Sequence, residues 1–207
     1  MIQARCKQED MSKESAIIEA ATRLFLRKGY SGVSMEEIAR ESAVAKQTLY
    51  SYFKGKDDLF RAIIRKQSES FFALLPRNDD PAVNIEDFLY QVGEAAMDMM
   101  FKRDTLELYR LAVAETPRFP ELGELYWQAG PQALIERMTD FLKNHGLTEE
   151  TAKIATEQFL SLTCGHMLSM ALLTKNCRPA KKEREERIPQ AVSAFFMMNG
   201  QYEREVS

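Results

Sequence analysis

The chain has 207 residues and a formal net charge of −3; 45% of its residues are hydrophobic and 29% are charged. This composition allows a substantial buried core beneath a charged surface. The three cysteines, Cys6, Cys164 and Cys177, are far apart and odd in number. Their arrangement fits a reducing cytoplasm better than a disulfide scaffold.

The most apolar stretch is too short for a membrane-spanning helix. Residues 158–174 form the longest uncharged run, 17 residues that include Gln, Ser, Thr and His. A membrane span needs about 20 mostly apolar residues, so we expect a helix buried inside protein. Residues 1–10 contain no apolar run, and a signal peptide is not expected. These observations favour a cytoplasmic protein without a membrane partner.

The charge is divided unevenly along the chain. Residues 1–66 carry 13 basic and 9 acidic side chains, a net charge of +4, whereas residues 67–207 carry 15 and 22, a net charge of −7. A basic N-terminal part on an acidic remainder suggests that the N-terminal part alone approaches a polyanion. Chance asymmetry is the alternative explanation of the same distribution.

The first two expected helices have clear end signals. Residues 13–28 place apolar side chains on one stripe, and Gly29 suits a left-handed C-terminal cap. Ser34 and Glu37 have the spacing of a capping box, in which the hydroxyl accepts from an amide and the carboxylate reaches back. A short second helix is therefore expected to begin at Ser34 and to end near residue 42.

Two further helices follow a three-residue turn at residues 43–45. The third helix is expected over residues 46–53, with Leu49 and Phe53 buried on one side by their i,i+4 spacing. Lys54-Gly55 ends it, and a fourth helix is expected over residues 56–75, with acidic side chains in its first turn.

The remaining helices lie beyond a loop at residues 76–81, which is the expected domain boundary. No alternating strand pattern is sustained, so the predicted fold is all-α with about nine helices. The predicted domains are an N-terminal helix-turn-helix domain (1–55), a connecting helix (56–75) and a larger C-terminal domain (76–207). The expected helices of the C-terminal domain cover residues 84–103, 104–115, 119–144, 149–175 and 186–199.

Two short helices joined by a tight turn need neighbours for stability, and packed against the first and fourth helices they form a helix-turn-helix unit. The second helix of such a unit lies in the DNA major groove. Lys46 and Gln47 come first and suit base edges, while Thr48 and Tyr50 suit a thymine methyl group. Tyr52 and Lys56, which follow later in the chain, suit phosphates, as does Ser34 at the N-terminus of the second helix. The candidate DNA-binding residues are Ser34, Lys46, Gln47, Thr48, Tyr50, Tyr52 and Lys56.

A plain helical domain with partly buried tyrosines and hydrated lysines is the alternative that spacing alone leaves open. The sequence AIIEAATRLFLRKGYSGVSMEEIARESAVAKQTLYSYFKGKDDLF, within residues 15–61, resembles the N-terminal domain of the TetR/AcrR family of transcriptional regulators. The resemblance implies that the third helix and Lys56 contact DNA, through the same seven residues. Two positions depart from the family pattern: Ala43 stands where the turn usually has glycine, and Ala45 has no capping oxygen.

The second domain carries a separate resemblance. Residues 109–134, YRLAVAETPRFPELGELYWQAGPQAL, resemble the C-terminal domain of the AefR-like branch of the family. That resemblance implies a ligand-responsive domain that forms a homodimer through its last two helices. The apolar faces of those helices agree with it, although a monomeric core is the alternative. The candidate dimer-interface residues are Ser161, Gly165, Leu168, Leu172, Val192, Phe195 and Phe196.

Eleven methionines are many for this length and suit an adaptable apolar pocket. Ordinary core packing is the alternative for each of them. The candidate ligand-binding residues, for a small hydrophobic ligand of unknown identity, are Met97, Met100, Phe101, Tyr109, Trp127, Met138, Phe141, Met167 and Met170.

No catalytic or metal-binding motif is found. The two histidines are His145 and His166, and Cys164 lies about 200° around a helix from His166, so they cannot bind one metal ion together. No CxxC, HExxH or phosphate-binding glycine loop occurs. We therefore expect no enzyme, no catalytic residues, no metal and no cofactor. A thiol sensor at Cys164 or Cys177 is not favoured over a buried structural cysteine.

Together these features predict a dimeric repressor that binds a palindromic, double-stranded DNA operator and is released by a small apolar ligand. A transcriptional activator or dual regulator of the same fold is one alternative. A small-molecule carrier with a vestigial DNA-binding domain is another.

Overall fold

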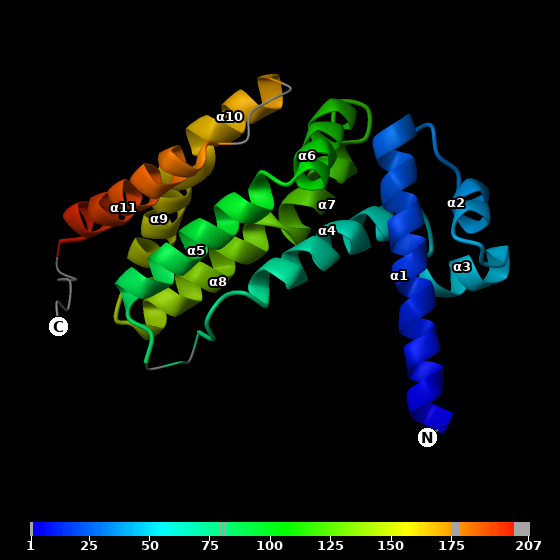
Figure 1. Ribbon diagram of the computed structural model, residues 1–207, viewed down its shortest axis with the longest axis horizontal. Helices are drawn as coiled ribbons and strands as arrows, with labels where there is room; N and C mark the ends of the chain where they lie inside the picture. The colour runs from blue at the N-terminus through cyan, green and yellow to red at the C-terminus, as the bar shows by residue number, and fades with distance from the viewer. Residues whose placement is uncertain (1, 79, 81, 175–178, 201–207) are drawn as a thin grey trace. The chain divides into compact units, whose positions relative to one another are not determined.

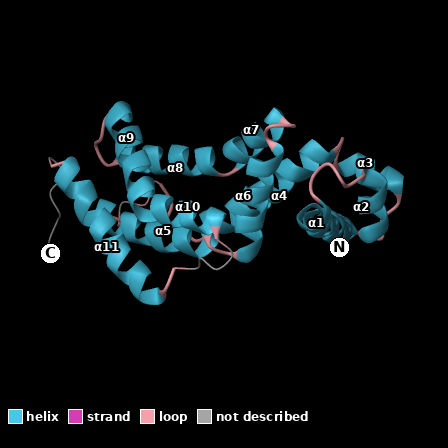
Figure 2. Ribbon diagram, turned by 90° about the horizontal axis from the view of Figure 1, so that it is seen from above, coloured by secondary structure: helices cyan, strands magenta, loops and turns pink. Residues whose placement is uncertain are grey.

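The computed structural model describes residues 2–78, 80, 82–174 and 179–200. These residues form eleven α-helices and one π-helical segment without any strand, which confirms the all-α prediction (Figures 1 and 2). The helices are α1 (Ile2–Lys28), α2 (Met35–Glu41), α3 (Lys46–Tyr52), α4 (Lys56–Phe72), α5 (Ile85–Met100), α6 (Arg103–Glu115), α7 (Pro120–Ala129), α8 (Pro131–Asn144), α9 (Glu149–Leu160), α10 (His166–Leu173) and α11 (Lys181–Met198), with the π-helical segment at Ser161–Gly165.

The chain divides into two compact units. The head unit comprises Met1–Gln67 and Glu107–Gly130, and the body unit comprises Ser68–Leu106 and Pro131–Ser207. The chain passes from one unit to the other within α4, within α6 and at Gly130–Pro131. This division differs from the predicted boundary after residue 75, because α7 and most of α6 belong to the same unit as the helix-turn-helix.

The head unit has one apolar core. Ile17, Leu24 and Phe25 of α1 are buried with Leu49 and Phe60, each fully inaccessible to solvent. Leu108 and Ala112 of α6 and Leu122 and Leu125 of α7 belong to the same core, which explains why residues 107–130 group with the helix-turn-helix. Figure 1 shows α2 and α3 beside α1.

The ends of the first two helices follow the predicted signals. Gly29 has a φ of +76°, the left-handed conformation that glycine adopts without a steric penalty, and its amide donates to the Phe25 carbonyl at 2.9 Å. The Ser34 hydroxyl accepts from the Glu37 amide at 3.2 Å. The Glu37 carboxylate instead accepts from the Lys28 ammonium group, so the capping box is formed on one side.

The body unit is built from α5, α8, α9, α10 and α11. Phe88 of α5 and Phe141 of α8 stack with ring centroids 3.6 Å apart. Gly93 of α5 lies against α11, since a Cβ at this position would be 3.0 Å from Ile188 Cγ2. A side chain at position 93 would require Ile188 to shift, so glycine favours the close packing of α11 against α5.

Three predicted helices of the second half differ from those observed. The expected helix 119–144 is divided at Gly130–Pro131, because a proline has no amide to donate and its ring obstructs the preceding turn. The expected helix 149–175 contains the π-helical segment and ends at Leu173, before the undescribed residues 175–178. The last helix begins at Lys181 rather than 186, and ion pairs from Lys181 to Glu185 and from Lys182 to Glu186 support its first turns.

Candidate nucleic-acid interface

The turn between α2 and α3 is tight and conformationally costly. Ala43 has a φ of 55°, the left-handed region in which a side chain is disfavoured by about 1–2 kcal/mol. The Val44 amide donates to the Ala39 carbonyl at 3.1 Å and closes the turn. Ala45 is the N-cap of α3 and offers no side-chain oxygen. The alanines at positions 43 and 45 therefore leave the turn with one strained residue and α3 without a side-chain N-cap.

Helix α3 presents a polar face opposite its apolar anchors. Leu49 is fully buried and Phe53 is 5% exposed, as the i,i+4 spacing predicts. The candidate DNA-binding residues on and beside α3 are accessible to different degrees: Ser34, Lys46, Gln47 and Tyr50 are exposed, and Thr48, Tyr52 and Lys56 are half-buried. This face combines charged, amide and phenolic groups, which suit both base edges and phosphates.

Lys46 has an intramolecular partner in this structure. Its ammonium group donates to Glu36 Oε1 of α2 at 2.5 Å and lies 5.9 Å from the centroid of the Tyr50 ring. The hydrogen bond to Glu36 raises the pKa of Lys46, and the same bond lowers the pKa of Glu36. Both side chains are about 60% exposed. An ion pair this exposed is weak, so a phosphate or a base edge can replace the carboxylate at small cost.

Lys56 faces inward rather than toward solvent. Its ammonium group donates to the Tyr30 carbonyl at 2.8 Å and lies 4.6 Å from the centroid of the Tyr30 ring. Desolvation by burial lowers the pKa of Lys56, while Asp57 and Glu115 act in the opposite direction. A phosphate contact by Lys56 therefore requires its side chain to turn away from Tyr30.

Sequence reasoning missed Tyr30, which joins three parts of the head unit. Its hydroxyl donates to Asp57 at the start of α4, and its amide donates to Glu115 Oε1 of α6 at 3.1 Å. Its ring lies edge-on to Phe119, with centroids 5.5 Å apart. Burial, and then the contact with Asp57, raises the pKa of Tyr30. No local pattern signals these contacts, because Glu115 lies 85 positions away in sequence.

The nine candidate ligand-binding residues do not form one group. Five belong to the core of the body unit, and Met100 is partly buried against it, while Met170 is 43% exposed. Tyr109 and Trp127 lie in the head unit, where Tyr109 stacks on Tyr126 at 5.2 Å and Trp127 is 51% exposed. Core packing accounts for the five buried residues, Met97, Phe101, Met138, Phe141 and Met167.

Two buried hydroxyls in the body unit are candidate functional groups that sequence reasoning missed. Thr156 is fully buried and Thr139 is 9% exposed, and neither hydroxyl has a hydrogen-bond partner among the described residues. Thr163, by contrast, donates to the Phe159 carbonyl at 2.7 Å, the usual arrangement for a helical threonine. An unpaired buried hydroxyl costs about 1–3 kcal/mol, so both groups are unusual features of the core of the body unit.

The candidate dimer-interface residues separate into two groups. Val192 and Phe195 are 0% and 1% exposed and pack within the body unit, which corrects their expected place on a surface. Ser161 is exposed, whereas Gly165, Leu168, Leu172 and Phe196 are half-buried. The apolar pattern of α11 does not show whether a given side chain packs within its own subunit or lies on the surface where a second subunit could bind. The strongly exposed apolar side chains nearby are Leu162, Met170, Leu173, Met197 and Met198.

Other kinds of site receive no support from the described residues. No group of three or more His, Cys, Asp or Glu side chains is placed to hold a metal ion in the part of the chain that the structure describes. None of the described helices is long and apolar enough to cross a membrane. Burial raises the pKa of the Cys164 thiol to about 12, so this residue is a poor nucleophile. Cys6 has no described side chain, and Cys177 lies outside the described residues.

Comparisons with known proteins agree with these observations. Residues 17–63 match the model of bacterial regulatory proteins of the tetR family, and residues 87–200 match the model of the AefR-like transcriptional repressor, C-terminal domain. A TetR-family regulator from Mesorhizobium loti is 28% identical, covers 91% of this chain and 97% of its own, and superposes with a TM-score of 0.75.

Two further relatives have more specific names. The flavonoid-responsive regulator FrrA is 28% identical, with 90% of this chain and 96% of that chain covered and a TM-score of 0.74. IcaR, a negative transcriptional regulator of a biofilm operon in Staphylococcus epidermidis, is 33% identical over 75 residues, 36% of this chain and 40% of its own. The matches to the first curated relatives span 21%, 66% and 40% of their length.

The second family model alone covers more than half of the chain, and the first covers the helix-turn-helix. Family members are transcriptional regulators rather than enzymes. The protein belongs to the TetR family of bacterial transcriptional regulators.

Proposed function

We propose that the protein is a repressor that binds a palindromic operator as a homodimer and leaves it when a small, largely apolar ligand binds the body unit. One observation carries the DNA-binding part: α3 exposes Lys46, Gln47 and Tyr50 while Leu49 and Phe53 hold its other side in the core. A short helix anchored in this way suits insertion into a major groove.

The residues of this face have separate roles in the proposal. Lys46 and Gln47, at the N-terminal end of α3, contact base edges and determine sequence preference. Tyr52, the Ser34 hydroxyl and Lys56 contact phosphates and fix the position of the helix. Lys56 reaches its phosphate only after it has left the Tyr30 carbonyl, so DNA binding exchanges one hydrogen bond for another.

Exposed apolar side chains support the dimer. Leu173 is 85% exposed and Met197 is 74% exposed, and Leu162, Met170 and Met198 are each at least 41% exposed. Exposed apolar side chains on the last helices of the chain are typical of an interface between subunits. A two-fold dimer carries two copies of α3 and therefore matches a palindromic site.

Two relatives support repression and the chemical class of the ligand. The AefR-like family model and IcaR are both named for negative regulation, and FrrA is named for its response to flavonoids. In the body unit, the unpaired hydroxyls of Thr139 and Thr156 suit a ligand with an apolar, aromatic body and a hydrogen-bonding group. A hydroxylated planar aromatic compound has this chemistry.

A gel-shift titration on the DNA upstream of the protein's own coding sequence tests the proposal. We expect specific retention, with affinity lowered by about 1–3 kcal/mol in Lys46→Ala because a base contact is lost. Lys153→Ala removes the same charge from an exposed site in the body unit and serves as the matched control. Equal losses in both variants, or no specific retention at all, contradict the proposal and favour a small-molecule carrier.

The same titration tests release. Hydroxyflavone is expected to weaken retention, and flavone, which lacks the hydroxyl, is expected to weaken it less. The coupling between ligand and DNA is expected to be about 1–3 kcal/mol. Tighter retention with hydroxyflavone contradicts release and indicates a co-repressor or an activating ligand instead.

A further inference from the structure

Helix α4 ends against an arginine from α8. After Phe72 the chain makes a turn, and the carbonyls of Leu75 and Pro76, three and four residues beyond the end of α4, face Arg137. The Arg137 guanidinium donates from Nη2 to the Pro76 carbonyl at 2.7 Å and lies 3.5 Å from the Leu75 carbonyl. Its central carbon lies 5.5 Å from the centroid of the Phe72 ring. The guanidinium thus pairs with the backbone of the loop that follows α4 and holds that loop on α8.

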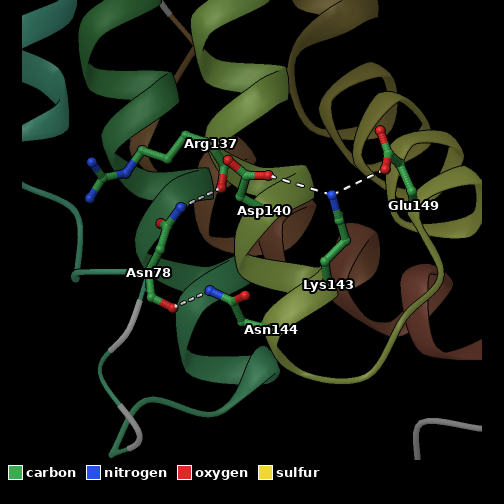
Figure 3. Close-up of polar contacts among 6 residues, drawn as sticks. All are labelled: Asn78, Arg137, Asp140, Lys143, Asn144 and Glu149. Carbon is green, nitrogen blue, oxygen red and sulfur yellow. Dashed lines mark hydrogen bonds and ion pairs between the residues drawn. The ribbon is translucent and has the colours of Figure 1, made fainter.

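The chain that follows α4 is fixed to the same helix by return contacts (Figure 3). The Asn78 side-chain amide donates to the Arg137 carbonyl at 3.1 Å, and the Asn144 amide donates to the Asn78 carbonyl at 3.1 Å. Arg137 and Asn144 are two turns apart on α8. The end of α4 and residues 75–78 are therefore attached along α8 rather than at one point. We call this set the Arg137 clamp: Arg137, Asn78, Asn144 and the carbonyls of Leu75 and Pro76.

The clamp contains two buried polar atoms whose hydrogen bonding is unsatisfied among the described residues. Arg137 Nε and Asn78 Oδ1 are buried and have no hydrogen-bond partner among the described residues. Desolvation by burial lowers the pKa of Arg137, so the charge is held where its hydration is reduced. Most buried polar groups in native proteins are paired. A cluster that tolerates two unpaired atoms suggests that its geometry serves another purpose besides stability.

The position of the clamp in the chain indicates that purpose. Helix α4 passes without a break from the head unit, which includes Gln67, into the body unit, which begins at Ser68. Its first turns belong to the head unit, where Leu59 and Phe60 are buried in the core. A rigid helix transmits the orientation of one end to the other. Fixing the C-terminal end on α8 therefore fixes the direction in which the helix leaves the body unit.

We propose that Arg137 is a positioning residue: the clamp sets the direction of α4 and thereby the separation at which the two helix-turn-helix units of a dimer meet DNA. The reference to DNA spacing rests on the proposed function above. The effect on α4 within one chain does not depend on it, so two experiments are needed.

The first experiment measures affinity for a selected operator and for versions with the half-sites moved apart or together by one base pair. The wild type is expected to prefer one spacing by about tenfold. Arg137→Met, which removes the donors but keeps a similar apolar stem, is expected to reduce that preference below about threefold. Arg137→Lys, which keeps the charge and one donor, is expected to restore part of the preference.

Two matched variants distinguish positioning from stability. Lys143→Met changes a neighbour on α8 whose ion-pair partners among the described residues are Asp140 and Glu149 of the body unit, and it is expected to leave the spacing preference unchanged. Asn78→Ala removes the hydrogen bond from the Asn78 side chain to the Arg137 carbonyl, while the arginine side chain is unchanged. This variant is expected to weaken the spacing preference. A general loss of stability lowers affinity at all spacings equally, whereas loss of the clamp flattens the spacing preference.

The second experiment requires no DNA. Spin labels at Arg27→Cys in α1 and Glu157→Cys in α9, in a chain with Cys6 and Cys177 replaced by serine, report the distance between the units. Dilution with unlabelled chain removes distances between subunits. The distribution is expected to be about twofold wider in Arg137→Met than in the wild type or Lys143→Met, as a helix with a released end explores more directions.

The outcomes are separable. Equal distance distributions in the wild type and Arg137→Met overturn the proposal, whatever the DNA experiment shows. A wider distribution together with an unchanged spacing preference also overturns it, because α4 then does not set the spacing. If the wild type binds no specific DNA, the proposed function fails, and the width of the distribution alone decides whether the clamp directs α4.

Discussion

At the scale of single residues, the turn of the helix-turn-helix contains avoidable strain. Ala43 adopts a left-handed conformation that glycine accepts readily. We predict that Ala43→Gly stabilises the protein by up to about 1 kcal/mol, since relief of the strain exceeds the added flexibility of the unfolded chain. Urea unfolding checks the prediction, with Ala45→Gly, at a position of ordinary φ, as the control. A loss of stability in Ala43→Gly contradicts it.

The same scale shows what a sequence does and does not reveal about a binding face. The burial of Leu49 and Phe53 and the exposure of Lys46 and Gln47 follow from helical periodicity alone. The inward orientation of Lys56 does not, because its partner is a backbone carbonyl 26 positions away. Local patterns identify the face of a helix, whereas long side chains choose partners that only the fold brings close.

At the scale of elements, the half-buried carboxylate of Glu115 joins α6 to the backbone of Tyr30 within the head unit. Glu115 accepts from the Tyr30 amide at 3.1 Å, and Tyr30 is only 3% exposed. We predict that Glu115→Ala destabilises the protein by about 1–3 kcal/mol, because it leaves a buried amide unpaired. Thermal unfolding measures the change.

Glu107→Ala is the control on the same helix, since Glu107 forms a partly exposed i,i+3 pair with Arg110 and its loss is expected to cost little. Glu115→Gln keeps an acceptor oxygen and is expected to fall between the two. Equal stabilities of Glu115→Ala and Glu107→Ala contradict a structural role for this contact and weaken the assignment of α6 to the head unit.

At the scale of the whole molecule, three weak acids whose pKa values are raised by burial contribute to the response to alkali. Burial raises the pKa values of Tyr30 and Tyr126, and it raises the pKa of Cys164 from about 9 to about 12. Each group stays protonated in the folded chain at a pH where the unfolded chain has lost the proton. Stability is therefore complete below about pH 9 and falls as pH rises toward about 12, by about 1.4 kcal/mol per pH unit for each such group.

Urea unfolding at a series of pH values checks this dependence. In Cys164→Ala the slope is expected to be shallower, because one of the three groups is gone. A variant whose slope equals that of the wild type contradicts the assignment of alkaline sensitivity to the buried thiol.

Much of the architecture was predictable from the sequence, and the exceptions have physical causes. Periodicity and end signals predict the C-terminal end of α1 and the bounds of α2 and α3 closely, but α1 begins at Ile2 rather than at residue 13 and α4 ends at Phe72 rather than at residue 75. The resemblance identifies the family that the comparisons confirm. The grouping of α6 and α7 with the helix-turn-helix was not predictable, because it depends on contacts between Leu108, Leu122 and α1 that are distant in sequence. The burial of Val192 and Phe195 within the body unit was not predictable for a related reason. An apolar stripe indicates that a helix face is buried, but not whether it packs within the same chain or against a second subunit.

The central claim is that the exposed face of α3 contacts DNA. The most direct measurement replaces Tyr50 with photoreactive benzoylphenylalanine and seeks a covalent cross-link to bound operator DNA. Trp127, another exposed aromatic residue of the head unit, is replaced in the same way as a control. We predict a cross-link from position 50 and none from position 127. Retained DNA binding without a cross-link at position 50, or equal cross-linking at both positions, would contradict this account.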